Sequence, residues 1–581
     1  MKNRIALLIT IFLLLGGILA VAYYYFVPNT SVVPAFSEDK LNLVIGGNVI
    51  SSKDNVKIKD GEILLPFSIV KEYIDKNIYW DSTSKKVTVT TKDRVIRMRT
   101  ESLQALVNNK PVNLKLSVSV EKDVVFIPIE FLSDFYKIQV KHIKENNVVV
   151  IDYAATSKQI AEPTRKSVAV RSGTSIRYPV IKRIAMEQKP EERALRVFEE
   201  TDKWYKVRTA DGSIGYVEKK SVSVKTVTEQ GAPPEEPKSN AWKPAKGKIS
   251  VTWEMMYEGV ADVSKLKKID GIDVVSPTWF QVANEKGDLI NRAVPKYMDW
   301  AHKNGYKVWA MLTNDFGDTK MTHKLLNSTD ARENLIRQIL AFASLYKLDG
   351  INIDFENINI QDKDALTQFV REITPFLREQ GLVVSMCVSP MDGSENWSLC
   401  YDRKSIGESV DYVMLMAYDQ SWPSFGPNAQ LSWVEKNMKK VMEQVPKEKL
   451  ILGVPFYSRL WKEETDKSGK KKTSYAKSLS IEAALKTIKE NKASVKWEEA
   501  SGQFYAEYKK DGISYKFWLE DKSSIELKAS LVHKYQLAGA AVWSANFGEE
   551  AAWKSLAANL KGIGNYDEWA QKNANRKYSL D

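Results

Sequence analysis

The chain has 581 residues, which is too long for a single domain and predicts three or four domains. Hydrophobic residues make up 44% and charged residues 27% of the sequence, as in ordinary globular proteins, and this excludes a largely disordered chain. The formal net charge of +12 favours an anionic partner such as a cell-wall polymer or a lipid surface. We expect no nucleic-acid partner, because no basic run is interleaved with a recognisable binding motif.

The N-terminal segment is apolar from Ile5 to Phe26, which is about 22 residues and enough to span the hydrocarbon core of a bilayer. Lys2 and Arg4 precede it, which favours a cytoplasmic N-terminus and an exported remainder. Its aromatic end, from Tyr23 onward, is typical of a membrane interface. We therefore expect a transmembrane signal anchor over residues 5–26 in a single-pass protein of the cell membrane, with the other domains outside. A cleaved signal peptide and a secreted protein are the alternative.

Residues 38–154 contain two similar stretches that are 62 residues apart, which indicates a possible internal repeat. Leu65-Pro66-Phe67 recurs as Ile127-Pro128-Ile129, and Val87-Thr88-Val89 recurs as Val149-Val150-Ile151. Each copy is expected to run from a strand into a short helix (68–75 and 130–136) and then into another strand, an α+β arrangement. The region resembles the stalk domain of exported Gram-positive proteins, which is similar to the N-terminal domain of copper amine oxidases. The resemblance implies a spacer or wall-contact role without copper, since the region has no His or Cys cluster.

Residues 164–225 combine short β-forming runs with turn signals. The run 204–208 leads through Asp211-Gly212 into the run 215–217, which is the pattern of a β-hairpin. The region resembles a bacterial SH3 domain, a small β-barrel that often binds peptidoglycan peptides. Trp204 and Tyr205 are either core residues or ligand contacts. Residues 226–246 follow as a linker rich in Pro and charge, which predicts a semi-rigid spacer.

Residues 247–563 alternate apolar runs with helical stretches, which is typical of a parallel α/β architecture. Eight apolar runs are strand candidates: 249–252, 273–279, 307–313, 350–356, 382–389, 412–418, 450–456 and 538–545. Most are continuously apolar, as expected for strands that are buried on both faces. The pattern predicts a (β/α)8 TIM barrel with a small insertion at about 459–525, between the seventh and eighth strands. The active site is expected at the carboxyl ends of the strands.

The fourth of these runs, together with the two residues before it (348–356, Leu-Asp-Gly-Ile-Asn-Ile-Asp-Phe-Glu), alternates apolar and polar side chains with period two. Asn352, Asp354 and Glu356 therefore share one face of a strand. Two carboxylates and an amide are costly to bury unless they are hydrogen-bonded or in use. Side chains two residues apart on one face of a strand stand about 6.5 Å from each other, so the charge of one carboxylate shifts the pKa of the next. These residues are the candidates for a catalytic site.

The segment resembles the DxxDxDxE signature of glycoside hydrolase family 18, the chitinase-like retaining hydrolases. Asp349, Asp354 and Glu356 match the first, third and fourth acidic positions. Asn352 stands where the second Asp is usual, as in the spore-cortex and peptidoglycan N-acetylglucosaminidase branch. Three later segments resemble the family in order and spacing: MxYD at 416–419, GxPxYGR at 453–459 with Ser458 replacing a Gly, and the last barrel strand at 541–544.

The resemblance implies a role for each catalytic residue. Glu356 protonates the leaving oxygen and then acts as base toward water, and Asp354 orients the substrate's 2-acetamido group. Tyr418 hydrogen-bonds the acetamido oxygen, which replaces an enzyme nucleophile. Asn352 cannot share a proton with Asp354 as an Asp does, but its amide is able to donate a hydrogen bond to that carboxylate.

Other family positions imply supporting and binding residues. Asp349 is expected to brace the end of the strand, and Met416 and Asp419 to support the site. Trp543 is expected to form the floor of the sugar subsite, and the substrate-binding residues also include Tyr457 and Arg459.

Together these features predict a membrane-anchored, exported hydrolase that cleaves β-1,4 bonds after N-acetylglucosamine by substrate-assisted retaining catalysis, with peptidoglycan as the expected glycan. Chitin or a chitooligosaccharide is the alternative substrate, and a catalytically silent glycan-binding protein is the alternative class. Relatives of that silent class commonly lose the terminal Glu, which this chain retains as Glu356. We expect no metal and no cofactor, because the chain has two cysteines and four scattered histidines. A bridge between Cys387 and Cys400 and the oligomeric state are left open.

Overall fold

The computed structural model describes residues 2–37, 39–228, 242–256, 262–422, 424–465 and 469–580. The chain forms two compact units. One comprises Met1–Ile78, Met98–Leu106 and Pro111–Lys238, and the other comprises Tyr79–Arg97, Val107–Lys110 and Ser239–Asp581. The second is called the catalytic unit below. Of the linker that the sequence predicts at 226–246, residues 229–241 lie outside the described residues.

The N-terminal segment folds into a single helix, α1 (Lys2–Phe26). A membrane-spanning helix needs about 20 consecutive, predominantly apolar residues. In the part of the chain that the structure describes, no helix is both long enough and apolar enough to cross a membrane. The transmembrane anchor expected over residues 5–26 is therefore not supported.

The stalk region forms two four-stranded sheets, with the strand orders β12-β13-β1-β2 and β10-β11-β4-β3. Their strands are β1 (Asn42–Ile45), β2 (Asn48–Val49), β3 (Lys57–Lys59), β4 (Glu62–Pro66), β10 (Ser119–Glu121), β11 (Val124–Pro128), β12 (Ile138–Ile143) and β13 (Val148–Tyr153). The two copies of the predicted repeat meet here, since β4 and β11 pair antiparallel with Leu65 opposite Ile127. Each of these strands ends in Pro and enters a helix, either α2 (Phe67–Ile69) with the turn η1 (Val70–Ile74), or α3 (Ile129–Tyr136).

The SH3-like region is a seven-stranded antiparallel sheet in the order β16-β15-β19-β18-β17-β14-β20. Its strands are β14 (Ser157–Pro163), β15 (Ser167–Arg171), β16 (Val180–Ala185), β17 (Leu195–Glu200), β18 (Trp204–Arg208), β19 (Ile214–Glu218) and β20 (Val222–Thr228), and α4 (Pro190–Arg193) precedes β17. β18 and β19 form the hairpin predicted around Asp211-Gly212. Trp204 is buried with only 6% of its surface exposed, which favours its core interpretation over ligand contact.

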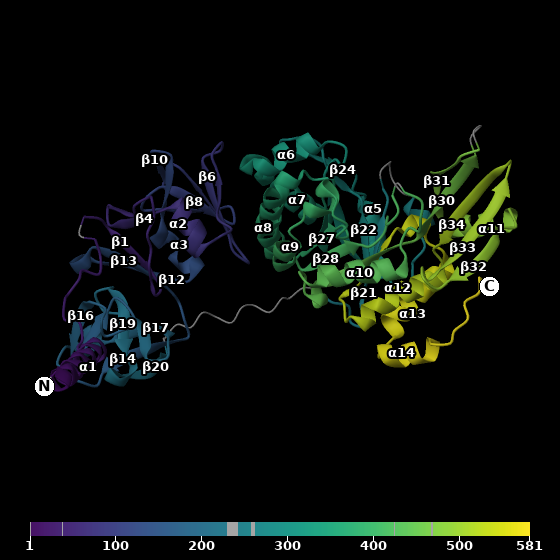
Figure 1. The fold of residues 1–581 in the computed structure, drawn as a ribbon. Coiled ribbons are helices and arrows are strands. Elements are labelled where there is room, and N and C mark those ends of the chain that lie inside the picture. Colours follow the sequence, from purple (N-terminus) through teal and green to yellow (C-terminus); the bar gives the residue numbers. More distant parts are fainter. Residues whose placement is uncertain are drawn as a thin grey trace. The chain divides into compact units, whose positions relative to one another are not determined.

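The catalytic unit contains a closed barrel of eight parallel strands (Figure 1). The strands are β21 (Ile249–Glu254), β22 (Val274–Pro277), β25 (Lys307–Thr313), β26 (Gly350–Asp354), β27 (Val383–Val388), β28 (Tyr412–Met416), β29 (Leu450–Pro455) and β35 (Gly539–Trp543). All eight coincide with the strands predicted from apolar runs, apart from a few end residues. The TIM barrel is thereby confirmed.

Helices follow the barrel strands and cover the barrel from outside (Figure 1). They are α5 (Pro295–Lys303), α6 (Thr319–Asn327), α7 (Thr329–Tyr346), α8 (Lys363–Glu379), α9 (Arg403–Ser409), α10 (Leu431–Met442), α12 (Lys522–Lys534) and α13 (Glu550–Gly562), with α14 (Tyr566–Asn573) near the end of the chain. A short hairpin of β23 (Phe280–Val282) and β24 (Leu289–Asn291) follows β22.

The predicted insertion lies between β29 and β35. It is a five-stranded sheet in the order β31-β30-β34-β33-β32 with one helix, α11 (Ile481–Glu490). Its strands are β30 (Tyr457–Thr465), β31 (Lys471–Ser480), β32 (Ser494–Glu498), β33 (Gln503–Lys510) and β34 (Ile513–Leu519).

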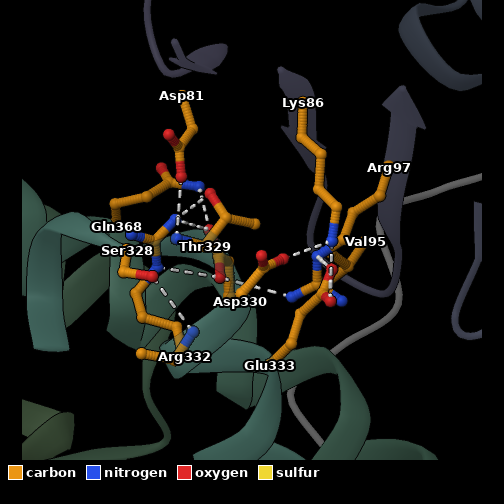
Figure 2. A network of polar contacts seen from close by, with 12 residues as sticks. Asp81, Lys86, Val95, Arg97, Ser328, Thr329, Asp330, Arg332, Glu333 and Gln368 are labelled. Carbon is orange, nitrogen blue, oxygen red and sulfur yellow. Dashed lines mark hydrogen bonds and ion pairs between the residues drawn. The ribbon is translucent and has the colours of Figure 1, made fainter. Parts of the chain in front are cut away.

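Residues 79–97 and 107–110 of the stalk region belong to the catalytic unit. Residues 79–113 form the sheet β5-β6-β7-β8-β9, built from β5 (Tyr79–Asp81), β6 (Lys86–Thr90), β7 (Val95–Arg99), β8 (Gln104–Val107) and β9 (Lys110–Asn113). Figure 2 shows how side chains from β5 to β7 reach the first turns of α7. Asp81 accepts a hydrogen bond from the Thr329 N–H at 2.9 Å, and Lys86 pairs with Asp330 at 2.7 Å and with Glu333 at 3.0 Å.

A buried network of charges anchors this contact. Arg97 lies 3.3 Å from Glu372 on α8, and Arg332 on α7 binds the same carboxylate through two nitrogens at 3.1 and 2.9 Å. All three side chains are at most 5% exposed. Val95, which is 1% exposed, joins the same hydrophobic core as the helices. Removal of one partner would leave a buried charge unpaired, so these ion pairs hold residues 79–97 within the catalytic unit.

Candidate active site

The carboxyl ends of the barrel strands surround a cavity of about 910 Å³. Acidic side chains line it, namely Asp315, Asp354, Glu356, Asp392 and Asp419. Aromatic side chains line it as well, namely Trp253, Phe316, Trp397, Tyr418, Trp422, Trp433, Tyr457 and Trp543. TIM barrels carry their active sites at this end. The combination of carboxyls and ring faces suits the hydrolysis and stacking of sugars.

Asp354 and Glu356 stand together at the end of β26. Asp354 is its last residue and is 4% exposed, and its Oδ1 has no hydrogen-bond partner among the described residues. The main chain of Glu356 is held on both sides by Asn314, which directly follows β25. The Glu356 N–H donates to Asn314 Oδ1 at 2.9 Å, and Asn314 Nδ2 donates to the Glu356 carbonyl at 2.9 Å. The neighbouring strand therefore fixes the position from which the Glu356 side chain enters the cavity.

Burial disfavours the ionised form of both carboxyls. It raises the pKa of Glu356 well above its ordinary value, and the negative charges of Asp354 and Asp419 raise it further. Burial also raises the pKa of Asp354, to about 7, although a hydrogen bond from Cys387 acts in the opposite direction. The negative charge of Asp354 opposes the ionisation of Glu356, so ionisation of Asp354 favours the protonated form of Glu356. Near neutral pH the pair thus offers a proton on Glu356 beside a carboxyl that is close to ionisation.

Asn352 does not donate to Asp354, contrary to the expectation from sequence. Its Nδ2 donates to Ser385 Oγ at 3.0 Å and points to Met414 Sδ at 3.5 Å. Its Oδ1 accepts from Trp253 Nε1 at 2.8 Å and from the Cys387 thiol at 3.4 Å. The reason is geometric, since side chains two apart on a strand stand about 6.5 Å apart while the neighbouring strands bring partners nearer. The Asn352 side chain therefore links its own strand to the neighbouring strands and donates no hydrogen bond to the Asp354 carboxylate.

Tyr418 lines the cavity just beyond β28, and its ring packs edge-on against Tyr457 with the centroids 6.5 Å apart. Burial raises the pKa of Tyr418 well above its ordinary value, so its phenol remains a hydrogen-bond donor. The Tyr457 hydroxyl donates to Asp419, which has a left-handed backbone (φ 62°) and also pairs with Arg459. Asp419 and Tyr457 line the cavity, whereas Arg459 lies behind them and holds Asp419 in place.

Trp543 and Met416 end two barrel strands and line the cavity. The sugar-floor role of Trp543 and the supporting role of Met416 stay predictions. The Trp543 ring lies beside Trp253, with the centroids 6.1 Å apart. Asp349 is separate from these residues. It precedes β26 and binds Lys307 at 2.7 Å and the Val308 N–H at 3.0 Å, so it braces strand ends away from the cavity.

Several cavity residues were missed from the sequence. Asn314 directly follows an apolar run, so its place at the carboxyl end of a strand was available as a signal. Trp397 lies on the short π-helix Glu395–Leu399 and Trp422 lies in a bend, and no local sequence pattern defines the course of either segment. Cys387 was seen only as a possible disulfide partner. It is unbonded, as is Cys400, so the bridge left open above is not formed.

A TIM barrel with this acid pair and aromatic lining has the fold and site of a glycosidase. The sequence model of the glycosyl hydrolases family 18 matches residues 255–548, about half of the chain, and the chain belongs to this family. The copper amine oxidase N-terminal domain matches residues 44–151, and the bacterial SH3 domain matches residues 166–223. The recognition of all three from sequence is confirmed.

Individual relatives are more distant. The chain is 26% identical over 290 residues to the uncharacterized glycosylase YvbX of Bacillus subtilis, a match that covers 48% of this chain and 82% of that protein. It is 25% identical over 251 residues to the cortical fragment-lytic enzyme of Bacillus subtilis, covering 42% of this chain and 57% of that enzyme. The crystal structure of the spore cortex-lytic enzyme SleL from Bacillus megaterium is 20% identical with a TM-score of 0.49, covering 59% of this chain and 78% of that structure.

Proposed function

We propose that this family 18 glycosidase cleaves β-1,4 bonds after N-acetylglucosamine in peptidoglycan, with the substrate's own acetamido group as nucleophile. One observation carries the proposal. A carboxyl that burial keeps protonated, Glu356, lies beside a buried carboxyl, Asp354, whose Oδ1 has no partner among the described residues. A proton donor and an unoccupied acceptor on one cavity wall are what substrate-assisted hydrolysis needs.

The reaction follows from these positions. Glu356 donates its proton to the glycosidic oxygen, while the acetamido oxygen attacks the anomeric carbon and the leaving sugar departs. Asp354 accepts a hydrogen bond from the acetamido N–H and stabilises the positive charge of the oxazolinium intermediate. Tyr418 donates to the acetamido oxygen and aligns it. Glu356, now ionised, takes a proton from water while the water oxygen attacks the anomeric carbon and opens the oxazolinium ring. The product has net retention of configuration, and Glu356 is protonated again as at the start.

Arg292 supports an anionic glycan over neutral chitin. Among the described residues that line the cavity, it is the only cation. Its guanidinium donates to Gln281 at 2.8 Å, and no ion pair with a carboxylate is formed by it within the described part of the chain. An arginine that faces a cavity without an acidic partner is able to bind a carboxylate of the substrate. Peptidoglycan has carboxylates on its peptide stems, whereas chitin has none.

This choice of substrate is tested with Arg292→Gln. A charge-assisted hydrogen bond contributes about 1.5–3 kcal/mol, so kcat/KM for soluble wall fragments is expected to fall at least about tenfold. The kcat/KM for neutral chitooligosaccharides is expected to stay within about twofold. Equal losses on both substrates would contradict an anion-binding role for Arg292.

The function as a whole is tested by digestion of purified vegetative wall, spore cortex and chitin, with the products identified by mass spectrometry after reduction of their new ends. We expect N-acetylglucosamine at the reducing ends of wall or cortex products, and no products with Glu356→Gln. Cleavage of chitin alone would establish the chitinase alternative. Binding of all three glycans without cleavage would establish the catalytically silent alternative.

We propose an extracytoplasmic location, because the proposed substrate lies outside the cytoplasmic membrane. The test is protease treatment of intact cells followed by fractionation. Degradation of the catalytic unit in intact cells is expected, and full protection of it in those cells would contradict the proposal. Recovery of the chain with the cells would indicate a cell-bound protein, and recovery from the medium would indicate a secreted one.

A further inference from the structure

The five-stranded sheet of the insertion has one face covered by α11 and an opposite face that the mechanism above does not use. Successive side chains of a strand point to opposite faces of its sheet. On β33 and β34, Ala506 and Phe517 pair with each other and pack in one hydrophobic core with Ala484 of α11 (Figure 1). Tyr505 and Trp518, the next pair along the same two strands, therefore lie on the opposite face.

Aromatic side chains cross this opposite face in an unbroken row. In order, the aromatic row consists of Tyr505, Trp518, Phe425, Trp461, Tyr475 and Trp422. The centroids of successive rings lie 5.2, 5.3, 5.9, 6.2 and 4.9 Å apart. Trp422 also lines the catalytic cavity, so the row begins at the cavity and leads away from it across the insertion.

The rings of the aromatic row are held in place but are not all buried. Trp461 is 1% exposed and donates its Nε1–H to the Gly426 carbonyl at 2.9 Å, which fixes the segment that carries Phe425 on the sheet. Phe425 is 45% exposed and Trp422 is 53% exposed. Neighbouring large rings that stay exposed in a folded unit mark an interaction surface.

Polar side chains on the same face make this surface suitable for a sugar polymer. Lys516, two residues before Trp518, pairs with Glu463 at 2.9 Å. Lys496 lies 5.5 Å from the centroid of the Tyr505 ring and forms no ion pair within the described part of the chain. Aromatic rings stack on the apolar C–H faces of β-linked sugars, and a lysine without a partner is able to bind a carboxylate of a peptide stem.

The size of the cavity indicates where such a polymer continues. Its volume of about 910 Å³ is that of a pocket for one small molecule, so a long substrate extends beyond it. We infer that the aromatic row binds the part of a peptidoglycan glycan strand that leaves the catalytic cavity. The inference deepens the proposed function and rests on it for the identity of the strand.

Four variants test the role of the rings. Phe425→Leu and Tyr505→Leu each remove one ring and keep an apolar side chain, whereas Phe425→Tyr keeps the ring. Tyr508→Leu is the matched control, because Tyr508 lies on the same strand as Tyr505 but on the α11 face, where it stacks on Tyr515.

The first readout is binding without cleavage. Each change is made in the full chain with Glu356→Gln, and the affinity for long, soluble, uncrosslinked peptidoglycan strands is measured by calorimetry. We expect Kd to rise about tenfold in Phe425→Leu and in Tyr505→Leu, and to stay within about twofold in Phe425→Tyr and Tyr508→Leu. Unchanged affinity in both ring-deleted variants, an equal loss in Tyr508→Leu, or no strand binding by the parent chain would overturn the inference. Because no turnover is needed, the expected pattern would support the aromatic row even if the wild-type chain cleaves no glycan.

The second readout separates the aromatic row from the catalytic cavity. In the active chain, kcat/KM for long strands is expected to fall about tenfold in Phe425→Leu, while kcat/KM for a short N-acetylglucosamine oligomer stays within about twofold. Equal losses on long and short substrates would mean that the ring supports the cavity, and this would overturn the inference. A dimer in sedimentation velocity that Phe425→Leu dissociates would assign the row to a second copy of the chain and would overturn it as well.

Discussion

Replacing Asp354 by Asn is expected to stabilise the catalytic unit, and more so as the pH rises. The folded structure raises the pKa of Asp354 from 3.8 to about 7 because the group is buried. A carboxyl whose pKa is raised by folding favours the folded state only while it is protonated, and this contribution is lost as the pH rises from about 4 through 7. The shift corresponds to a penalty of about 4 kcal/mol above pH 7, and Asn avoids this penalty because it does not ionise.

The assay is guanidinium unfolding at pH 5 and pH 8, followed by tryptophan fluorescence. All tryptophans except Trp204 belong to the catalytic unit, so the signal reports mainly on that unit. The advantage of Asp354→Asn in free energy of unfolding is expected to grow by about 3 kcal/mol between the two pH values. Asp392→Asn, a change at an exposed carboxyl on the cavity wall, is the control and is expected to show no such growth. If the variant has the same advantage at both pH values, or is less stable than wild type at pH 8, the burial argument is refuted.

Three further outcomes are expected. Glu356→Gln should lower turnover about 10²–10⁴-fold, while glycan binding measured by calorimetry should persist. Activity above about a tenth of wild type would exclude Glu356 as the general acid. The pH profile of kcat/KM should rise as Asp354 ionises near pH 7 and fall as Glu356 loses its proton at higher pH, and a profile without an alkaline limb would contradict the protonated acid. Arg97→Met should destabilise the catalytic unit by about 2–3 kcal/mol, because Glu372 then keeps only Arg332 as its cation. Lys110→Met is the control at an exposed ion pair with Glu379 and should cost at most about 1 kcal/mol. Equal costs for these two variants would show that the Arg97 contact does not anchor β5 to β7.

The barrel and its acid pair were predictable because their signals are local. Parallel strands that are buried on both faces appear as continuous apolar runs, and each of the eight runs became a barrel strand. Asp354 and Glu356 were visible because polar residues interrupt such a run with period two. The hairpin around Asp211-Gly212 and the Pro-ended strands β4 and β11 were found in the same way, from turn chemistry and short repeats.

Contacts between distant segments were not predictable from those signals. The partners of Asn352 come from β21, β27 and β28, so the residue's own strand did not reveal that its amide was already in use. The stalk region looked like one continuous domain, yet Arg97 finds its partner Glu372 across 275 residues. The N-terminal apolar run was interpreted by hydropathy alone, and the expected anchor is not supported by the described structure.

The central claim is that the substrate's acetamido group does the work of an enzyme nucleophile. The most direct measurement compares turnover of one soluble oligosaccharide with its N-acetyl groups intact and after their chemical removal, at equal enzyme concentration and with binding of both measured. We predict cleavage of the acetylated form alone, with inhibition by a thiazoline that mimics the cyclised intermediate. Comparable cleavage of the deacetylated form, or a sugar–enzyme ester detected by mass spectrometry, would contradict the mechanism.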